Sequence, residues 1–232
     1  EDNPDLGGTP RHTVRGAMMG DILQSDEEEI VFKVEVSGAS PIERIDIRNG
    51  LETVEVFRPY GEADLGNRIR VLWEGSEYRG RGRETIWDGS AELTGNGFAA
   101  LSPINRYNLD KRFDQTGPGR IEWTALTTGG FGGFDAWLED PRGGTLTIDT
   151  ELVKETISIA DIGYDEMIFE NGGIDRRIRI FRLPDENPHT TATVERRIKL
   201  AEDVATGAAM QLADGIDRAG PARCQVGHVE WL

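Results

Sequence analysis

Short runs in which apolar and mostly polar residues alternate recur along this chain. The first run is EIVFKVEVS at residues 29–37, where Ile30, Phe32, Val34 and Val36 form one apolar row. Successive side chains of a strand point to opposite faces, so this pattern predicts a strand with one buried face. The segment 37–41 supplies turn residues, and Asn49-Gly50 predicts a hairpin between a strand with Ile45 and Ile47 and a returning strand with Val54 and Val56.

The same signal returns at short intervals through most of the chain. Its members are Ile69 with Val71, Ala91 with Leu93, Ile121 with Trp123, Phe134 with Ala136, Leu146 with Ile148, Ile157 with Ile159, Ile178 with Ile180, and Ala192 with Val194. About a dozen such runs favour an all-β chain built as an antiparallel β-sandwich with little helix. Residues 201–220 differ: their spacing fits a short helix, but Gly207 weakens it, so a helix and an ordered loop both remain open.

Charge and composition narrow the classes of partner. The formal net charge is −16, which disfavours nucleic acid and anionic membranes as partners. No apolar run approaches the ~20 residues that span a bilayer. The single cysteine, Cys224, cannot form an internal disulfide. The sequence opens with EDNPDLGGTP and no methionine, so the lack of a signal peptide says little about the compartment, and a cytoplasmic location is only slightly favoured.

Motifs for catalysis or metal binding are scarce. His12, His189 and His228 lie far apart in the sequence, without HxH, HExxH or CxxC spacing, and neither GxSxG nor a phosphate-binding loop occurs. On a strand, Cys224 and His228 would lie ~13 Å apart, too far for a direct hydrogen bond. We therefore predict no catalytic residue, no metal site and no cofactor in this chain.

One stretch, EYRGRGRETIWDG at 77–89, is the best candidate for ligand binding. Arg79, Arg81 and Arg83 occupy alternate positions, and Tyr78 and Trp87 lie nearby. On a strand the three arginines would share a face and grip a carboxylate or a sugar acid. In so acidic a chain, ion pairs with its own Asp and Glu residues are the favoured interpretation.

Three weaker candidates have structural explanations or no supporting motif. The acidic run SDEEE at 25–29 lacks the spacing of a calcium loop and is expected to be a solvated turn. TTGGFGGFDAW at 127–137 could present aromatic rings to a sugar, but a tight bend with Phe131 and Phe134 packed inward explains it more simply. Asp135 and Glu139, four residues apart, would share a strand face as paired carboxylates of a hydrolase, although no motif supports that role.

Several segments resemble a known family. RHTVRGAMMGDIL, VSGASPIERIDIRNGLETVEVFRPYGEADLG, VLWEGSEYRGRGRETIWDG and ENGGIDRRIRIFRLP resemble the C-terminal region of a bacterial family of unknown function, over about residues 11 to 200. The N-terminal half of that family resembles PHP-type metal-dependent phosphoesterases. RCQVGHVEW at 223–231 is similar to the family's closing strand, with one residue fewer between Gln and His and without the terminal SSPIY.

The resemblance implies a domain organisation. Shorter members join the first hairpins almost directly to the closing strand, which implies an Ig-like β-sandwich part from residues 14–76 and 221–232 and an inserted β-unit at 77–200. The family's metal-binding signature, of the GDLHxHT type, has no counterpart here, so no catalytic residue carries over.

Two functions of different classes remain open at this stage. The first is a non-catalytic accessory domain of a PHP-like metal-dependent hydrolase, with the hydrolase-like N-terminal half of the parent protein as its partner. The second is a β module that binds a carbohydrate or an acidic small molecule through Arg79, Arg81, Arg83, Tyr78 and Trp87.

Overall fold

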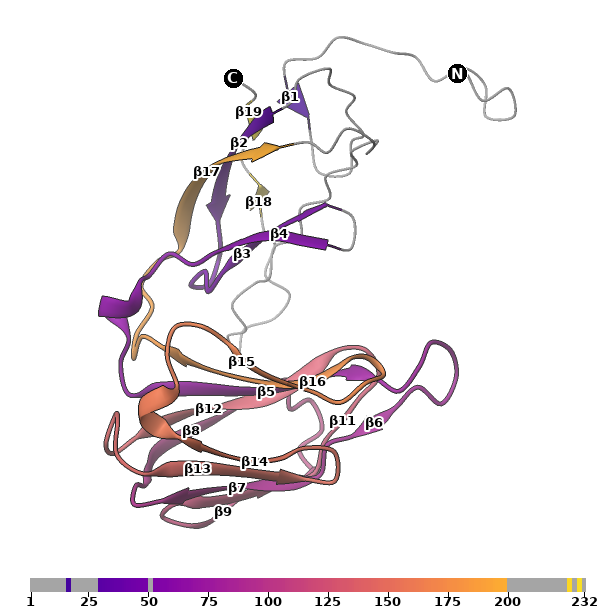
Figure 1. Cartoon of the computed structure of the whole chain (residues 1–232), viewed down its shortest axis with the longest axis vertical. Coiled ribbons are helices and arrows are strands. Elements are labelled where there is room, and N and C mark those ends of the chain that lie inside the picture. The colour runs from indigo at the N-terminus through magenta and orange to yellow at the C-terminus, as the bar shows by residue number, and fades with distance from the viewer. Residues whose placement is uncertain (1–15, 18–28, 50–51, 200–224, 227–228, 231–232) are drawn as a thin grey trace. The chain divides into compact units, whose positions relative to one another are not determined.

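A computed structural model describes residues 16–17, 29–49, 52–199, 225–226 and 229–230 of the chain (Figure 1). The chain divides into two compact units. One comprises Tyr60–Glu186, and we call it the sandwich unit; the other comprises Glu1–Pro59 together with Asn187–Leu232, and we call it the terminal unit.

The sandwich unit holds two five-stranded antiparallel sheets, which lie one above the other in Figure 1. The first has the order β15-β16-β5-β12-β8, with β5 (Arg68–Ser76), β8 (Phe98–Ile104), β12 (Phe131–Leu138), β15 (Met167–Glu170) and β16 (Ile174–Leu183). The second has the order β14-β13-β7-β10-β9, with β7 (Gly89–Thr94), β9 (Phe113–Gly117), β10 (Arg120–Trp123), β13 (Thr145–Thr150) and β14 (Lys154–Ser158). A small ribbon pairs β6 (Thr85–Ile86) with β11 (Leu126–Thr127).

Alternation along the strands builds the core of this unit. On β5, Ile69, Val71 and Trp73 are buried in the main hydrophobic cluster, together with Ile121 and Phe134 from other strands. Burying an apolar side chain of this size contributes ~1.5–3 kcal/mol. Trp73 stacks on Trp123 of the second sheet, with ring centroids 4.9 Å apart and ring planes 7° apart. This stack lies near the C-terminal ends of β5 and β10, so it aligns those two strand ends.

The terminal unit is built around one central strand, β2 (Glu29–Ser37). Its Val36 pairs with Ala192 of β17 (Thr191–Lys199) and with Val226 of β18 (Gln225–Val226), so the two partners lie on opposite edges of β2. β19 (Val229–Glu230) also pairs with β2, and β1 (Gly16–Ala17) pairs with β19. The remaining described strands of the terminal unit are β3 (Ile45–Asn49) and β4 (Glu52–Phe57), which pair as a hairpin. The core of the terminal unit is formed by Val34, Val36, Ile42, Ile45, Ile47 and Val194.

The prediction of an all-β antiparallel chain is confirmed for the described residues. Two 3-10 helices of three residues each, η1 (Glu62–Asp64) and η2 (Ile159–Asp161), are the helical elements there. None of these helices has the length and apolar character that crossing a bilayer requires.

The unit boundaries differ from those drawn at residues 76 and 200. β5 pairs with β12 and β16 and so belongs to the sandwich unit, whereas β17 pairs along its whole length with β2. Several predictions from the sequence lie outside the described residues: those on residues 201–220, on residues 25–28 of the acidic run SDEEE, and on His12, Cys224 and His228.

Candidate functional site

The exposed apolar side chains of the sandwich unit gather at one end. β5 and β8 end there, and β12 begins there, because Phe131 pairs with Glu74 and Ile104 pairs with Gly133. We call this region the loop end and define it as residues 77–84, 105–112, the β6–β11 ribbon and Phe131. Among the described residues, six of the eight exposed large hydrophobic side chains lie in it: Tyr78, Ile86, Tyr107, Leu109, Leu126 and Phe131.

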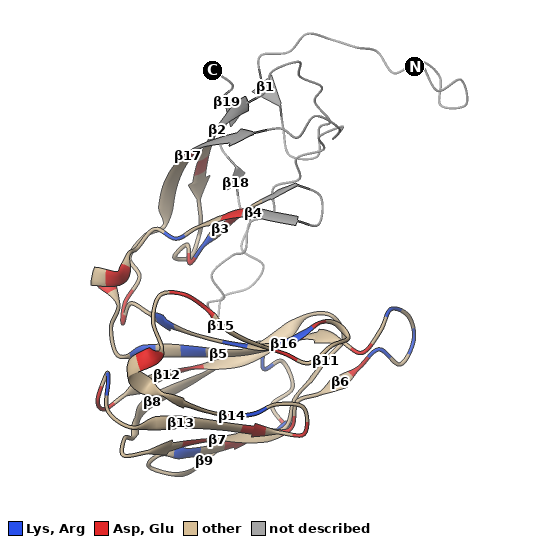
Figure 2. Cartoon of the chain, in the orientation of Figure 1, with Lys and Arg blue, Asp and Glu red and all other residues tan. Residues whose placement is uncertain are grey.

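The arginine-rich stretch forms a loop of the loop end. The sequence predicted a strand for Arg79, Arg81 and Arg83, but the three residues lie in the loop that joins β5 to β6. The intervening Gly80 and Gly82 have φ of +117° and +71°, a backbone region that interrupts a strand. Figure 1 shows this loop projecting beyond the sheets, and Figure 2 shows Lys and Arg residues along it.

These arginines point into solvent. All three are exposed, and within the described parts of the chain no ion pair joins any of them to a carboxylate. The expected pairing with internal Asp and Glu residues is therefore not seen. The loop is held at its base, where the Glu77 N–H donates to the Arg83 carbonyl over 3.2 Å and the Glu77 carboxylate pairs with Arg176.

The two aromatic candidates in this stretch have different surroundings. Tyr78 is half exposed, whereas Trp87 is fully buried. The Trp87 Nε1–H donates to the Thr127 hydroxyl over 2.9 Å, and that hydroxyl donates to the Gly75 carbonyl over 2.6 Å. Trp87 thus belongs to the core below the ribbon and is not available to a ligand. Directly across the ribbon, Ile86 pairs with Leu126, and both side chains face solvent.

A second loop, Asn105–Arg112, presents further exposed side chains. Arg106 donates to the carbonyls of Leu109 and Lys111, at distances between 2.7 and 3.2 Å. Held in this way, Tyr107 is 88% exposed and Leu109 is 78% exposed. Neither residue was predicted from the sequence. The available signal was an aromatic and an aliphatic residue inside the polar turn sequence NRYNLDKR, where burial is not expected.

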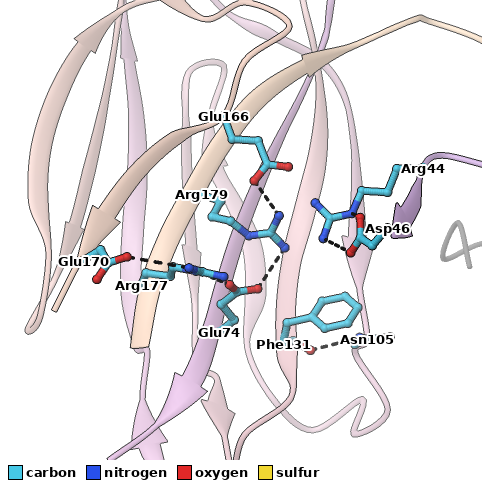
Figure 3. Close-up of polar contacts among 9 residues, drawn as sticks. All are labelled: Arg44, Asp46, Glu74, Asn105, Phe131, Glu166, Glu170, Arg177 and Arg179. Atoms are coloured by element: carbon cyan, nitrogen blue, oxygen red, sulfur yellow. Dashed lines mark hydrogen bonds and ion pairs between the residues drawn. The ribbon is translucent and has the colours of Figure 1, made fainter. Parts of the chain in front are cut away.

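Asn105 joins this loop to the start of β12. It has a φ of +53°, and its Nδ2–H donates to the Phe131 carbonyl over 3.0 Å (Figure 3). Its Oδ1 accepts from the Tyr107 hydroxyl over 2.9 Å. Phe131 itself is 36% exposed, so the expectation that it packs inward is wrong, while Phe134 is fully buried as expected. Residues three apart on a strand lie on opposite faces, so only one of the two can enter the core.

The outer face of the first sheet carries charges that neutralise one another. Glu74 accepts from both Arg177 and Arg179, at 2.5 and 2.9 Å, and Arg179 also pairs with Glu166 at 2.8 Å (Figure 3). Burial by itself lowers the pKa of Arg179, but the carboxylates of Glu74 and Glu166 outweigh it, and the pKa lies above that of a free guanidinium. A separate close pair in Figure 3 is Arg44 with Asp46, in the terminal unit.

The carboxylates considered as a hydrolytic pair are not arranged as one. Asp135 forms a buried bidentate ion pair with Arg70, and Glu139 lies one residue beyond the end of β12. In the parts of the chain that the structure describes, no three side chains among His, Cys, Asp and Glu lie together as a potential metal site, and His189 is exposed.

A shallow hollow of about 470 Å³ lies at the opposite end of the sandwich unit, where β12 turns into β13. Arg182 lines it and donates to the carbonyls of Ile159, Ile162 and Gly66. Burial lowers the pKa of Arg182, and the nearby charge of Arg142 lowers it further. Since these bonds occupy the guanidinium with main-chain oxygens, its role at this end is structural.

No family model, curated protein or solved structure matches this chain.

Proposed function

We propose that this chain is a non-catalytic β-sandwich module that binds a ligand through the loop end of its sandwich unit. One observation carries the proposal: six exposed apolar or aromatic side chains and three exposed arginines gather at the same end. An exposed apolar cluster of this kind, bordered by charged groups, is characteristic of a binding surface. The charged groups of the outer sheet face, by contrast, are occupied in ion pairs with one another.

The resemblance described above extends the proposal to the parent protein. We propose that the module is an accessory domain of a bacterial PHP-like metal-dependent hydrolase and has the hydrolase-like half as its partner. In that arrangement the enzyme half carries the metal and the chemistry, while this chain supplies a rigid scaffold and a binding surface. A reading frame that continues upstream of Glu1 into a PHP-like segment would support this part, and one that lacks such a segment would contradict it.

A ligand screen with matched variants tests the binding function directly. The full chain is assayed against a panel of glycans and organic acids, and each binder is retested with Tyr78→Ala and with Arg81→Ala. The control is Arg142→Ala, an exposed arginine in the turn after β12, at the opposite end of the unit. We expect the two loop-end variants to lose binding and the control to keep it. Equal binding by all three variants would contradict the proposal.

The non-catalytic part has its own assay. The chain is incubated with p-nitrophenyl phosphate and with bis-p-nitrophenyl phosphate in the presence of Mn²⁺ or Zn²⁺. We expect release of nitrophenol no faster than in buffer with the same metal. Metal-dependent turnover that scales with protein concentration would place chemistry in this chain and overturn the proposal.

A further inference from the structure

We infer that the ligand of the loop end is an acidic polysaccharide whose sugar rings carry carboxylates. This inference rests on the proposed function and names the chemistry that the surface recognises. It follows from three features of the loop end: its rings, its cations and the way its loops are held.

The cations select a negatively charged ligand. Arg79, Arg81 and Arg83 extend into solvent, and each planar guanidinium can bind one carboxylate through two parallel hydrogen bonds. The neighbouring loop adds the exposed Lys111, while the guanidinium of Arg106 is occupied by the carbonyls of Leu109 and Lys111. In a chain of net charge −16, a local concentration of positive charge attracts anions that the rest of the surface repels.

The exposed rings indicate that the anion also has an apolar face. Tyr107, Tyr78 and Phe131 expose between 36% and 88% of their surface. A small inorganic anion or a carboxylate alone gains little from such rings. A pyranose ring, in contrast, offers a flat face of C–H groups that packs against an aromatic ring, while its carboxylate lies at the edge of the ring, within reach of an arginine.

The spacing of the two loops favours a polymer over a single sugar. β5 and β8 are the two neighbours of β12, so the loops that leave them begin about two strand spacings, or ~10 Å, apart. A chain of several sugar units can contact both loops at once. Arg106 and Asn105 hold the second loop in place before binding, which reduces the entropy that the ligand must overcome.

The experiment is isothermal titration calorimetry of the full chain with four probes. Oligogalacturonate carries rings and carboxylates, its fully methyl-esterified form keeps the rings without the charge, poly-L-glutamate carries carboxylates without sugar rings, and heparin adds sulfate. We expect oligogalacturonate to bind most tightly and its ester at least ~10-fold more weakly, as loss of a charge-assisted bidentate contact predicts. Higher salt should weaken the binding.

Three variants identify the contacts. Arg81→Ala should weaken oligogalacturonate binding about 10-fold or more, Tyr107→Ala about 3- to 10-fold, and Arg142→Ala should leave it unchanged. If the ester binds as tightly as oligogalacturonate, the carboxylate is not recognised. If poly-L-glutamate binds equally well and Tyr107→Ala has no effect, the ligand is an acidic peptide. If heparin binds and oligogalacturonate does not, the anionic group that the surface recognises is sulfate. Each of these results overturns the inference.

Failure here is distinguishable from failure of the proposed function. If oligogalacturonate does not bind, but another ligand from the wider screen does and is lost with Arg81→Ala, the binding function stands and the acidic sugar is wrong. If no ligand depends on the loop end, both are wrong.

Discussion

The guanidinium of Arg70 and the carboxylate of Asp135 form a buried bidentate ion pair across neighbouring strands. Arg70 Nε lies 2.6 Å from Oδ1 and Arg70 Nη2 lies 2.8 Å from Oδ2. The two residues are register partners on β5 and β12. Both side chains are at most 10% exposed, so the pair has little solvent to screen it.

Removing one partner of this pair should be costly. Asp135→Ala removes the carboxylate that forms the bidentate pair with the buried Arg70, and we expect it to lower the free energy of unfolding by about 3–5 kcal/mol. The double variant Arg70→Met with Asp135→Leu should recover most of this loss. Urea unfolding followed by tryptophan fluorescence reports on this unit, because Trp73, Trp87, Trp123 and Trp137 all belong to it. A loss below about 1 kcal/mol for Asp135→Ala would show that the pair contributes little.

Trp87 and Tyr78 should have opposite effects when replaced. Trp87→Phe removes the donor to Thr127 and leaves a gap in the core, so it should lower the free energy of unfolding by about 1–3 kcal/mol. Ligand affinity should change little in that variant. Tyr78→Ala, at a half-exposed loop position, should leave stability within ~0.5 kcal/mol and weaken binding. Unfolding and binding assays on both variants check this. Loss of binding with Trp87→Phe and loss of stability with Tyr78→Ala would place Trp87, not Tyr78, in the binding surface.

Asp140 provides a prediction on pH. Its Oδ1 accepts from the N–H groups of Arg142 and Gly143, at 2.8 and 2.9 Å, and these bonds lower the pKa of Asp140 below its ordinary value of 3.8. A carboxyl whose folded-state pKa is depressed contributes stability that is present above its unfolded pKa and is lost as the pH falls through the folded pKa. We expect the turn after β12 to loosen only in strong acid.

An NMR titration of the Asp140 carboxyl checks that its pKa is lowered, and the same titration in urea supplies the unfolded reference. The amide signals of Arg142 and Gly143 should move with the carboxyl. A folded-state pKa at or above the value in urea would contradict the assigned hydrogen bonds.

Much of the strand content was predictable from alternation, because burial on one face imposes a period of two. Ile69, Val71 and Trp73 show that pattern in the sequence, and all three are buried in the core. The pairing of β17 with β2 was not predictable, because an apolar row indicates which face of a strand is buried but not which strand lies beside it.

The candidate site was predictable in part. The stretch containing Tyr78 and the three arginines was recognised, but its alternation was interpreted as a strand, which the positive φ of Gly80 and Gly82 precludes. Trp87 was misassigned because a sequence does not show whether an aromatic residue beside a turn points to the core or to solvent. Tyr107 joins the site through Asn105, whose Oδ1 accepts from the Tyr107 hydroxyl and whose Nδ2–H donates to the distant Phe131 carbonyl.

Binding through the loop end of the sandwich unit can be tested by hydrogen–deuterium exchange of the full chain with and without oligogalacturonate. We expect slower exchange on binding in residues 77–84 and 105–112, and no change in the turn at 139–144 at the opposite end. Protection confined to 139–144, or no protection anywhere at saturating oligogalacturonate, would contradict it.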